Sequence, residues 1–333
     1  SQGLQGPEIF IYWTQTAKMA RITQLPESPS SLSWSNDGKQ LAFSMFVPSA
    51  APVIAQIPKS PKGAKWAKKP RITDRLNHEA DGRGYLPTGY SHLFVMSSEG
   101  GAIRQISSGN YHHRGNLSWS KDNKALYFSA NRTPNWEYDF RNSEVYKISL
   151  QDGLITPLTE RDGPDYSPIV SPNGKMIAYL GFDDKREAYQ NHRLYLMDCD
   201  GENKRPISQY LDASISSIKW DADNKGIYFS FDHQGNGKIG YISLDGKVSK
   251  IADNQGGTTL GRPYSSGMFS ISQNGKIAYT YTRPEHPADI AFIDKKGENW
   301  TRLTKLNQSL FTNKKLGKVE SIWYSSSVDG RKL

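Results

Sequence analysis

The chain has 333 residues with 36% hydrophobic and 11% aromatic content, a single cysteine and a formal net charge of +9. One cysteine excludes an internal disulfide and a multi-cysteine metal site, and no apolar run approaches the ~18 residues of a membrane span. We therefore expect a soluble protein without cofactor, metal or membrane partner, in a prokaryotic cytoplasm or periplasm that the sequence does not distinguish.

The first predicted element, residues 1–26, is the end of a repeating unit. The stretch EIFIYWTQTAKMARITQ (8–24) matches the last two strands of the units that follow it. No basic region, apolar stretch and cleavage site occur in order, so we expect no signal peptide. Because the sequence begins within a unit, we expect a homo-oligomer, or flexibility near Ser1, at the face that is left uncovered.

A stretch of twelve residues, LSWSNDGKQLAF (32–43), returns along the chain as LSWSKDNKALYF, PIVSPNGKMIAY, IKWDADNKGIYF and FSISQNGKIAY. Its lysines lie at positions 39, 124, 175, 225 and 276, so the spacings are 85, 51, 50 and 51. A period near 50 with one insertion indicates a repeat architecture. Each copy sets two alternating apolar runs around Asn, Asp and Gly, which is the pattern of a β-hairpin.

Each unit continues with a third apolar run, a Gly-containing turn and a fourth short run, as in LFVM (93–96) and IRQIS (103–107). Four antiparallel strands per ~50 residues predict an all-β fold, a β-propeller of five full blades and a half blade. A sandwich of irregular strands is the alternative, which the regular spacing disfavours. Trp34, Trp119 and Trp220 are expected to pack between blades. The predicted blades cover residues 27–108, 109–160, 161–210, 211–254 and 255–305, with an exit strand in 306–333.

The loops of the predicted blades differ in length. Turns between strands one and two, and between strands three and four, are short and repetitive, whereas the other loops are long and individual. Propeller geometry puts these two sets on opposite faces, and function is usually displayed on long loops. The insertion at about 47–90 lies on the long-loop face as a lid, an oligomer arm or a plain loop. Its basic block, 59–71, lacks a nucleic-acid motif, so we expect a solvated loop or a partner-binding surface.

The candidate binding residues lie on these long loops. A carboxylate there could bind the amino group of a peptide, and an arginine could bind a carboxylate or a carbonyl. The alternative is that these charges bind each other or hold a domain interface. The candidates are Arg132, Trp136, Glu137, Tyr138 and Asp139 from one loop, Asp183 and Arg186 from the next blade, and Arg262 and Tyr264 after GGTTLG.

Several stretches are more specific than the repeat. They are PRITDRLNHEADGRGYL, SHLFVM, FSANRTPNWEYD, GFDDKREAYQ, GGTTLGRPY and the closing VESIWYSSSVDGRKL. In these residues the chain, from about Glu8 to Leu333, resembles the β-propeller of the prolyl oligopeptidase family of serine peptidases, in its acylaminoacyl-peptidase and dipeptidyl-aminopeptidase branch. TolB-like propellers share the repeat itself.

The resemblance implies a parent of about seven blades, of which roughly one and a half precede Ser1. It also implies that the closing stretch leads into an α/β-hydrolase domain of the same chain, and that the parent cuts short peptides or acyl-peptides. In the dipeptidyl-peptidase branch a Glu-Glu pair on the propeller holds the amino terminus of the substrate. No Glu-Glu occurs in this sequence, which puts dipeptidyl specificity in doubt and leaves Glu137 as the best single substitute.

The catalytic elements of such a peptidase are not found in the sequence. A hydrolase of this type needs a serine on a strand-to-helix elbow, G-x-S-x-G, followed by Asp and His. The stretch GYSHL (89–93) comes closest and fails at its last position. The segment 221–226, DADNKG, imitates a calcium loop, but a lysine stands where an oxygen ligand is needed, so we predict a hairpin turn.

Two hypotheses follow for the function of the chain. The first is a substrate-gating propeller of a serine exopeptidase or oligopeptidase, inactive by itself, whose partners are the hydrolase domain and a short peptide substrate. The second is a TolB-like propeller for protein interactions with no attached enzyme. The GGTTLGRPY stretch and the predicted exit strand favour the first.

Overall fold

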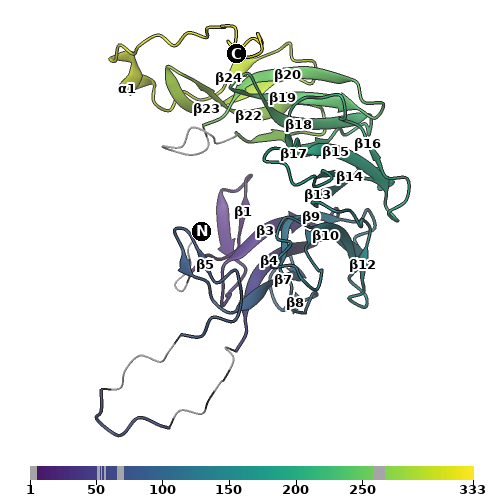
Figure 1. Ribbon diagram of the computed structural model, residues 1–333, viewed down its shortest axis with the longest axis vertical. Helices are drawn as coiled ribbons and strands as arrows, with labels where there is room; N and C mark the ends of the chain where they lie inside the picture. Colours follow the sequence, from purple (N-terminus) through teal and green to yellow (C-terminus); the bar gives the residue numbers. More distant parts are fainter. Residues whose placement is uncertain (1–5, 51–52, 54, 56–57, 66–70, 258–266) are drawn as a thin grey trace. The chain divides into compact units, whose positions relative to one another are not determined.

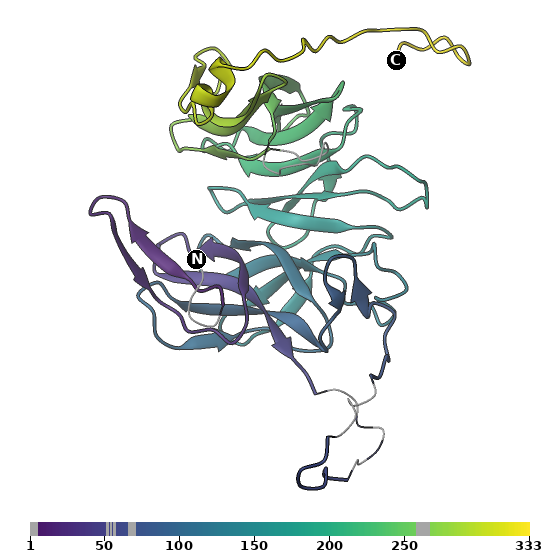
Figure 2. The same cartoon turned by 90° about the vertical axis from the view of Figure 1, so that its left-hand side faces the viewer.

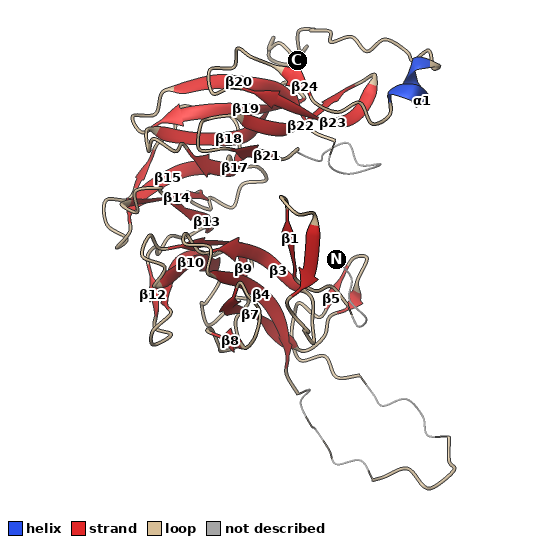
Figure 3. Ribbon diagram, turned by 180° about the vertical axis from the view of Figure 1, so that it is seen from behind, coloured by secondary structure: helices blue, strands red, loops and turns tan. Residues whose placement is uncertain are grey.

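The computed structural model describes residues 6–50, 53, 55, 58–65, 71–257 and 267–333. It forms two compact units, Ser1–Tyr210 and Leu211–Leu333. The regular elements are strands apart from one five-residue helix in the described part of the chain, α1 (Gln308–Thr312). The expected all-β class is confirmed (Figures 1 and 3).

The first unit contains three antiparallel four-stranded sheets, whose strands follow one another in sequence order. A short hairpin, β5 (Glu79–Ala80) and β6 (Gly84–Tyr85), lies between the second and third strands of the first of these sheets, β4 (Gln40–Pro48) and β7 (Gly89–Ser97). The three sheets are β3 (Pro29–Trp34), β4 (Gln40–Pro48), β7 (Gly89–Ser97) and β8 (Ile103–Gln105); β9 (His113–Trp119), β10 (Ala125–Ala130), β11 (Glu144–Ser149) and β12 (Ile155–Pro157); and β13 (Asp165–Val170), β14 (Met176–Gly181), β15 (Arg193–Asp198) and β16 (Arg205–Pro206).

A two-stranded hairpin precedes these sheets, β1 (Phe10–Trp13) and β2 (Lys18–Arg21). Its tip projects beyond the four-stranded sheets of the same unit (Figure 2). The hairpin lies within 1–26, where the sequence predicts the last two strands of a blade, and that assignment stays a prediction.

The second unit repeats the same four-strand order twice. A single residue pair, Gln255 with Tyr281, links the two sets into one sheet. The helix α1 lies beside β23 (Figures 1 and 3). The strands are β17 (Ile215–Trp220), β18 (Gly226–His233), β19 (Asn236–Ser243) and β20 (Val248–Gln255), then β21 (Phe269–Ile271), β22 (Ile277–Arg283), β23 (His286–Ile293) and β24 (Thr301–Arg302).

The recurring hairpin turn has a specific hydrogen-bond pattern. The Ser120 hydroxyl donates to Asp122 Oδ1 at 2.6 Å and accepts from the N–H of Lys124 and Ala125 at 3.1 and 2.9 Å. Asp122 Oδ1 also accepts the N–H of Lys124 at 3.1 Å. The same serine-to-carboxylate or serine-to-amide contact recurs at Ser35–Asp37, Ser171–Asn173 and Ser272–Asn274. The repeat is thus explained by side chains that satisfy the turn backbone.

A second recurring contact ties strand four to strand three. The Thr159 hydroxyl accepts the N–H of Val145 at 2.9 Å and donates to Glu144 Oε2 at 2.5 Å. The same arrangement joins Thr23 to Glu8, and Thr304 to Asp289. Each pair holds the short fourth strand, which contributes few ladder hydrogen bonds of its own, to the start of the third strand.

Side chains from neighbouring sheets form a shared core in the first unit. Leu93 and Val95 of β7 pack with Leu126 and Phe128 of β10 in one buried cluster. Trp119 is buried there, and its Nε1 donates to the carbonyl of Ser33 at 3.2 Å, which confirms its predicted position between sheets.

The prediction for Trp34 is wrong. Its side chain is 50% exposed, because no preceding four-stranded sheet covers this side of β3 in the part of the chain that the structure describes. Trp220 is buried, and its predicted packing between blades stays a prediction.

The predicted exit segment, 306–333, does not form a strand along its length. Residues 319–324 are exposed and lie in no strand, and α1 precedes them. The extended pairing seen in 306–333 is a single bridge between Ser325 and Lys332. The segment 221–226 forms the predicted turn between β17 and β18.

Candidate functional site

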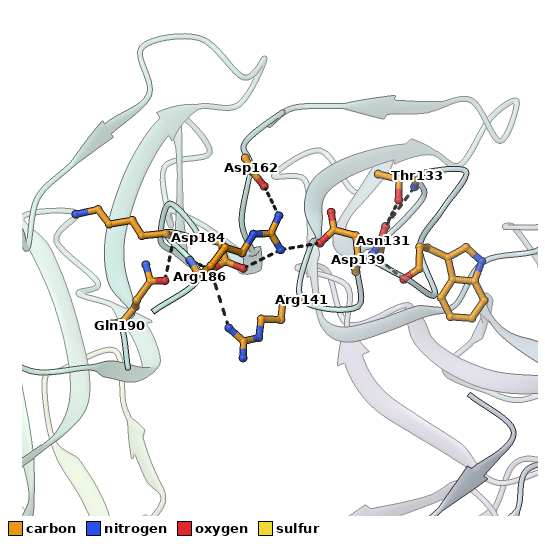
Figure 4. Close-up of polar contacts among 10 residues, drawn as sticks. Asn131, Thr133, Asp139, Arg141, Asp162, Asp184, Arg186 and Gln190 are labelled. Atoms are coloured by element: carbon orange, nitrogen blue, oxygen red, sulfur yellow. Dashed lines mark hydrogen bonds and ion pairs between the residues drawn. The ribbon is translucent and has the colours of Figure 1, made fainter. Parts of the chain in front are cut away.

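Two loops from neighbouring sheets carry most of the candidate residues. The β10–β11 loop covers 131–143 and the β14–β15 loop covers 182–192, and both connect strands two and three of their sheets. The connection 158–164, between β12 and β13, lies between them. All three segments belong to the first unit, and Figure 4 shows their side chains meeting.

Arg186 joins these three segments. Its guanidinium lies 3.7 Å from Asp139 Oδ1, 3.4 Å from Asp162 Oδ1 and 3.5 Å from Asp184 Oδ2 (Figure 4). Its backbone N–H donates to Asp184 Oδ1 at 2.8 Å, and its φ of 59° lies in the left-handed region. Arg141 approaches Asp184 from the other loop at 4.0 Å. One arginine therefore fixes the two loops to each other.

A second arginine, Arg161, pairs with two further aspartates. Arg161 Nε is 3.2 Å from Asp165 Oδ1, and its Nη1 is 3.4 Å from Asp183 Oδ1. The Asp165 side chain is 1% exposed, and burial raises its pKa to about 6. Burial likewise raises the pKa of Glu144, which neighbours Asp165, to about 7. Both carboxyl groups therefore hold protons in a pH range where exposed carboxyl groups are ionised.

The β10–β11 loop is braced from within. Asn131 Nδ2 donates to the carbonyl of Asp139 at 2.7 Å, and Asn131 Oδ1 accepts the N–H of Thr133 at 3.2 Å (Figure 4). Tyr138 at its tip is 77% exposed. Glu137 Oε1 is buried, and it has no hydrogen-bond partner among the described residues. A buried carboxylate oxygen without a hydrogen-bond donor carries an uncompensated desolvation cost, which a cation or an N–H donor would relieve.

Arg132 and Trp136 contact a different part of the unit. Arg132 Nη1 lies 2.6 Å from His113 Nε2, and its guanidinium stacks over Tyr111 at 4.9 Å. The Trp136 ring meets His112 edge-on at 5.7 Å and Tyr90 at 6.4 Å. The predicted residues on this loop thus point to two places: Asp139 to the Arg186 network, and Arg132 and Trp136 to the histidines.

The structure brings Asp139 and Arg186 together and places Asp183 on Arg161 beside them. These three side chains bind other charges of the same chain, as the alternative to substrate binding expects. Arg262 and Tyr264 lie outside the described residues.

Sequence reasoning missed Arg161, Asp162 and His113. Arg161 and Asp162 follow the fourth strand of one predicted blade, where an inter-blade loop begins, so their position on the long-loop face could have indicated them. His113 opens a first strand and is fully buried, and no sequence pattern marks it.

The second unit has a cavity of about 270 Å³ that the sequence did not indicate. It lies at the β22–β23 turn, between the start of β23 and α1. Glu285, His286 and Arg302 are among its lining residues, and Arg302 is paired with the buried Asp289. This turn also connects strands two and three of its sheet.

Within the described ranges, no group of three histidine, cysteine or acidic side chains has the arrangement of a metal site. The helical part of those ranges is also too short and too polar to cross a bilayer.

The Arg186 network gives a prediction for stability. Replacing Arg186 by leucine should lower the free energy of unfolding by about 1 kcal/mol, because the 2% exposed Asp184 side chain loses its nearest cation. Urea unfolding at low and at high salt measures the effect, which salt should reduce. Lys185→Leu, one residue away, is the matched control and should change little. An equal loss in both variants would contradict the role of Arg186.

Comparison with known proteins supports the resemblance drawn from the sequence. A family model of the dipeptidyl peptidase IV (DPP IV) N-terminal region matches residues 64–186. Dipeptidyl-peptidase 5 of Porphyromonas gingivalis is 24% identical over 222 residues, which is 65% of this chain and 31% of that protein. The uncharacterized peptidase YuxL of Bacillus subtilis is 24% identical over 337 residues, which is 96% of this chain and 49% of that protein. The chain thus spans less than half of either relative.

Solved structures agree on the fold. The acylaminoacyl peptidase of Pyrococcus horikoshii superposes with a TM-score of 0.69 at 17% identity, covering 98% of this chain and 45% of that one. TolB of Acinetobacter baumannii gives a TM-score of 0.55 at 15% identity, covering 86% and 57%. The chain is a protein of the β-propeller class. More particularly, it is related to the N-terminal propellers of prolyl oligopeptidase-family peptidases.

Proposed function

We propose that this chain is the non-catalytic, substrate-gating propeller of a serine exopeptidase or oligopeptidase that cleaves short peptides. Its partner is an α/β-hydrolase domain of the same protein, and the loops between strands two and three border the substrate space. The family match and the relation to the acylaminoacyl-peptidase fold support this proposal.

The observation that carries the proposal is the pair of loops fixed to each other beside Glu137. The Arg186 network holds the β10–β11 and β14–β15 loops in one arrangement. On the first of them, Glu137 has a buried carboxylate oxygen without a partner among the described residues. Glu137 is partly exposed although its Oε1 is buried, so a small movement of the side chain would let its carboxylate accept from the amino terminus of a peptide, an ammonium group with three N–H donors.

The test uses the whole protein that contains this segment. We expect Glu137→Gln to lower kcat/KM about tenfold to a hundredfold for a peptide anilide with a free amino terminus, because a charge-assisted hydrogen bond is lost. The corresponding N-acetylated substrate should change less than twofold. Steady-state kinetics on both substrates measures the difference.

Glu187→Gln, an exposed position on the β14–β15 loop, is the control and should leave both substrates unaffected. Equal losses on free and blocked substrates would remove Glu137 from the role of amino-terminus binding.

The alternative is a TolB-like propeller for protein interactions, which the fold similarity to TolB favours. Under this alternative, the whole protein should hydrolyse neither the free nor the N-acetylated peptide anilide. It should also carry no serine that reacts with a fluorophosphonate probe. A labelled serine outside this chain would exclude that alternative.

A further inference from the structure

Four arginines gather around the histidines at the β9 end of the first unit. Arg75 and Arg83 come from the segment that follows the basic block, Arg114 comes from β9, and Arg132 comes from the β10–β11 loop. Arg114 bonds to His112, and the Tyr90 ring lies between His112 and Arg75, whereas Arg132 bonds to the next histidine, His113. Burial and the nearby Arg83 lower the pKa of Arg114, and after burial Arg114 and Arg75 lower the pKa of the His112 imidazole.

Three of these four arginines have no acidic partner among the described residues. Among the described residues, no carboxylate lies within ion-pair distance of Arg83, Arg114 or Arg132, and Arg75 has one contact, with the adjacent Asp74 at 3.8 Å. The neighbouring loops show the opposite. There the guanidinium groups of Arg141 and Arg186 face aspartates (Figure 4), and that of Arg161 pairs with Asp165. The same unit therefore has one arginine set that is neutralised internally and one that is not.

The histidines orient two of these guanidinium groups without neutralising them. Burial, followed by the nearby arginines, lowers the pKa of His112 to about 4 and that of His113 to about 3, so both imidazoles are neutral near pH 7. His113 Nε2 accepts from Arg132 at 2.6 Å, which leaves Nδ1 to donate to the carbonyl of Ser91 at 3.3 Å. His112 Nδ1 accepts from Arg114 at 3.1 Å. A neutral imidazole nitrogen that accepts a hydrogen bond orients the guanidinium group and leaves its positive charge uncompensated.

Aromatic rings line the same place. Tyr90, His112 and Trp136 lie within 5.3–6.4 Å of one another, and the Arg75 guanidinium lies 6.0 Å over Tyr90. Arg132 stacks on Tyr111. An apolar wall beside unpaired guanidinium groups suits a carboxylate on a short carbon stem, because arginine binds carboxylates through two parallel N–H donors.

We infer that Arg114 and Arg75, which meet across His112 and Tyr90, form a carboxylate-binding site for short peptides, with Arg83 at its edge. The carboxylate is an acidic side chain or a C-terminus. This inference rests on the proposed function for the identity of the ligand as a peptide, but it concerns residues other than Glu137. The positive charge of these arginines attracts the ligand, and the aromatic wall contacts its stem.

The test measures binding to the 333-residue chain itself, so it does not depend on hydrolysis. Three peptides serve as probes in calorimetric titration: acetyl-Ala-Glu-Ala-amide, acetyl-Ala-Gln-Ala-amide and acetyl-Ala-Gln-Ala with a free C-terminus. We expect the glutamate peptide, the C-terminal acid, or both, to bind at least tenfold more tightly than the neutral amide. The preferred acid identifies the source of the carboxylate. High salt should weaken this preference.

Variants show whether the arginines are responsible. Arg114→Gln and Arg75→Gln should each reduce the preference for the acid about tenfold, and Arg114→Lys should restore part of it. Arg104→Gln, an exposed position on β8, is the control and should keep the full preference. Because only part of the Arg114 side chain is covered, its replacement should leave the circular dichroism spectrum unchanged.

Equal affinity for the three peptides, or an unchanged preference in Arg114→Gln, would overturn the inference. Such a result would leave the Glu137 experiment on the whole protein unaffected, so the failure of one proposal can be told from the failure of the other.

Discussion

Replacing Phe128 by alanine should lower the free energy of unfolding by about 4 kcal/mol. The ring is fully buried in β10, and it stacks on Tyr146 of the neighbouring strand with centroids 5.6 Å apart. It also lies 5.4 Å from the His113 ring and belongs to the cluster that joins β7 of one sheet to β10 of the next. Its loss therefore weakens contacts within a sheet and between two sheets at once.

Urea unfolding followed by tryptophan fluorescence measures the effect, and an unchanged m-value would show that the variant unfolds from the same folded state. Tyr138→Ala is the control, because this ring is 77% exposed at a loop tip and should change stability by less than about 0.5 kcal/mol. A loss below about 1 kcal/mol for Phe128→Ala would mean that neighbouring sheets do not depend on each other for stability.

The repeating sheets could be predicted because one blade has a local sequence signal. Turns such as that at Ser120 need a hydroxyl and, two residues later, a carboxylate or amide that accepts a backbone N–H, so these two polar residues recur with the period of the blade. Alternating apolar residues then place the strands on either side. The exposure of Trp34 could not be predicted in the same way, since it depends on what covers β3 and not on the pattern around it.

The candidate site was predictable as a region but not as a set of contacts. Loop length placed Asp139 and Arg186 on the same face, yet whether a charge binds substrate or a neighbouring loop depends on distances that spacing does not give. The structure pairs Arg186 with three aspartates, whereas Arg132 binds His113. Two arginines on adjacent loops thus have different surroundings. Arg186 lies among carboxylates, whereas Arg132 lies beside a neutral imidazole.

The neutral state of the buried histidines predicts how stability depends on pH. His113 is fully buried beside Arg132 and His92, and burial, followed by the charge of Arg132, lowers its pKa from about 6.5 to about 3. The folded protein therefore does not take up a proton on His113 between pH 6.5 and 3, whereas the unfolded chain does. The stability that this residue contributes is complete above pH 6.5 and falls as the pH falls, by about 2 kcal/mol at pH 5.

Glu144 and Asp165 act in the opposite direction. Burial raises the pKa of these carboxyl groups to about 7 and about 6, so their contribution to stability grows as the pH falls toward their unfolded pKa values. The effect of His113 on stability is therefore best measured by comparing the unchanged protein with a His113 variant, because both keep Glu144 and Asp165.

We expect His113→Gln to reduce the loss of stability between pH 6.5 and 5 by about 2 kcal/mol relative to the unchanged protein. Any loss of packing in the variant is independent of pH, so the difference in slope isolates the proton. Urea unfolding at several pH values measures it, and His233→Gln, which removes an exposed histidine, is the control. Parallel pH profiles for His113→Gln and the unchanged protein would mean that His113 takes up its proton in the folded chain as readily as in the unfolded one. An imidazole held neutral between Arg132 and the carbonyl of Ser91 is incompatible with that result.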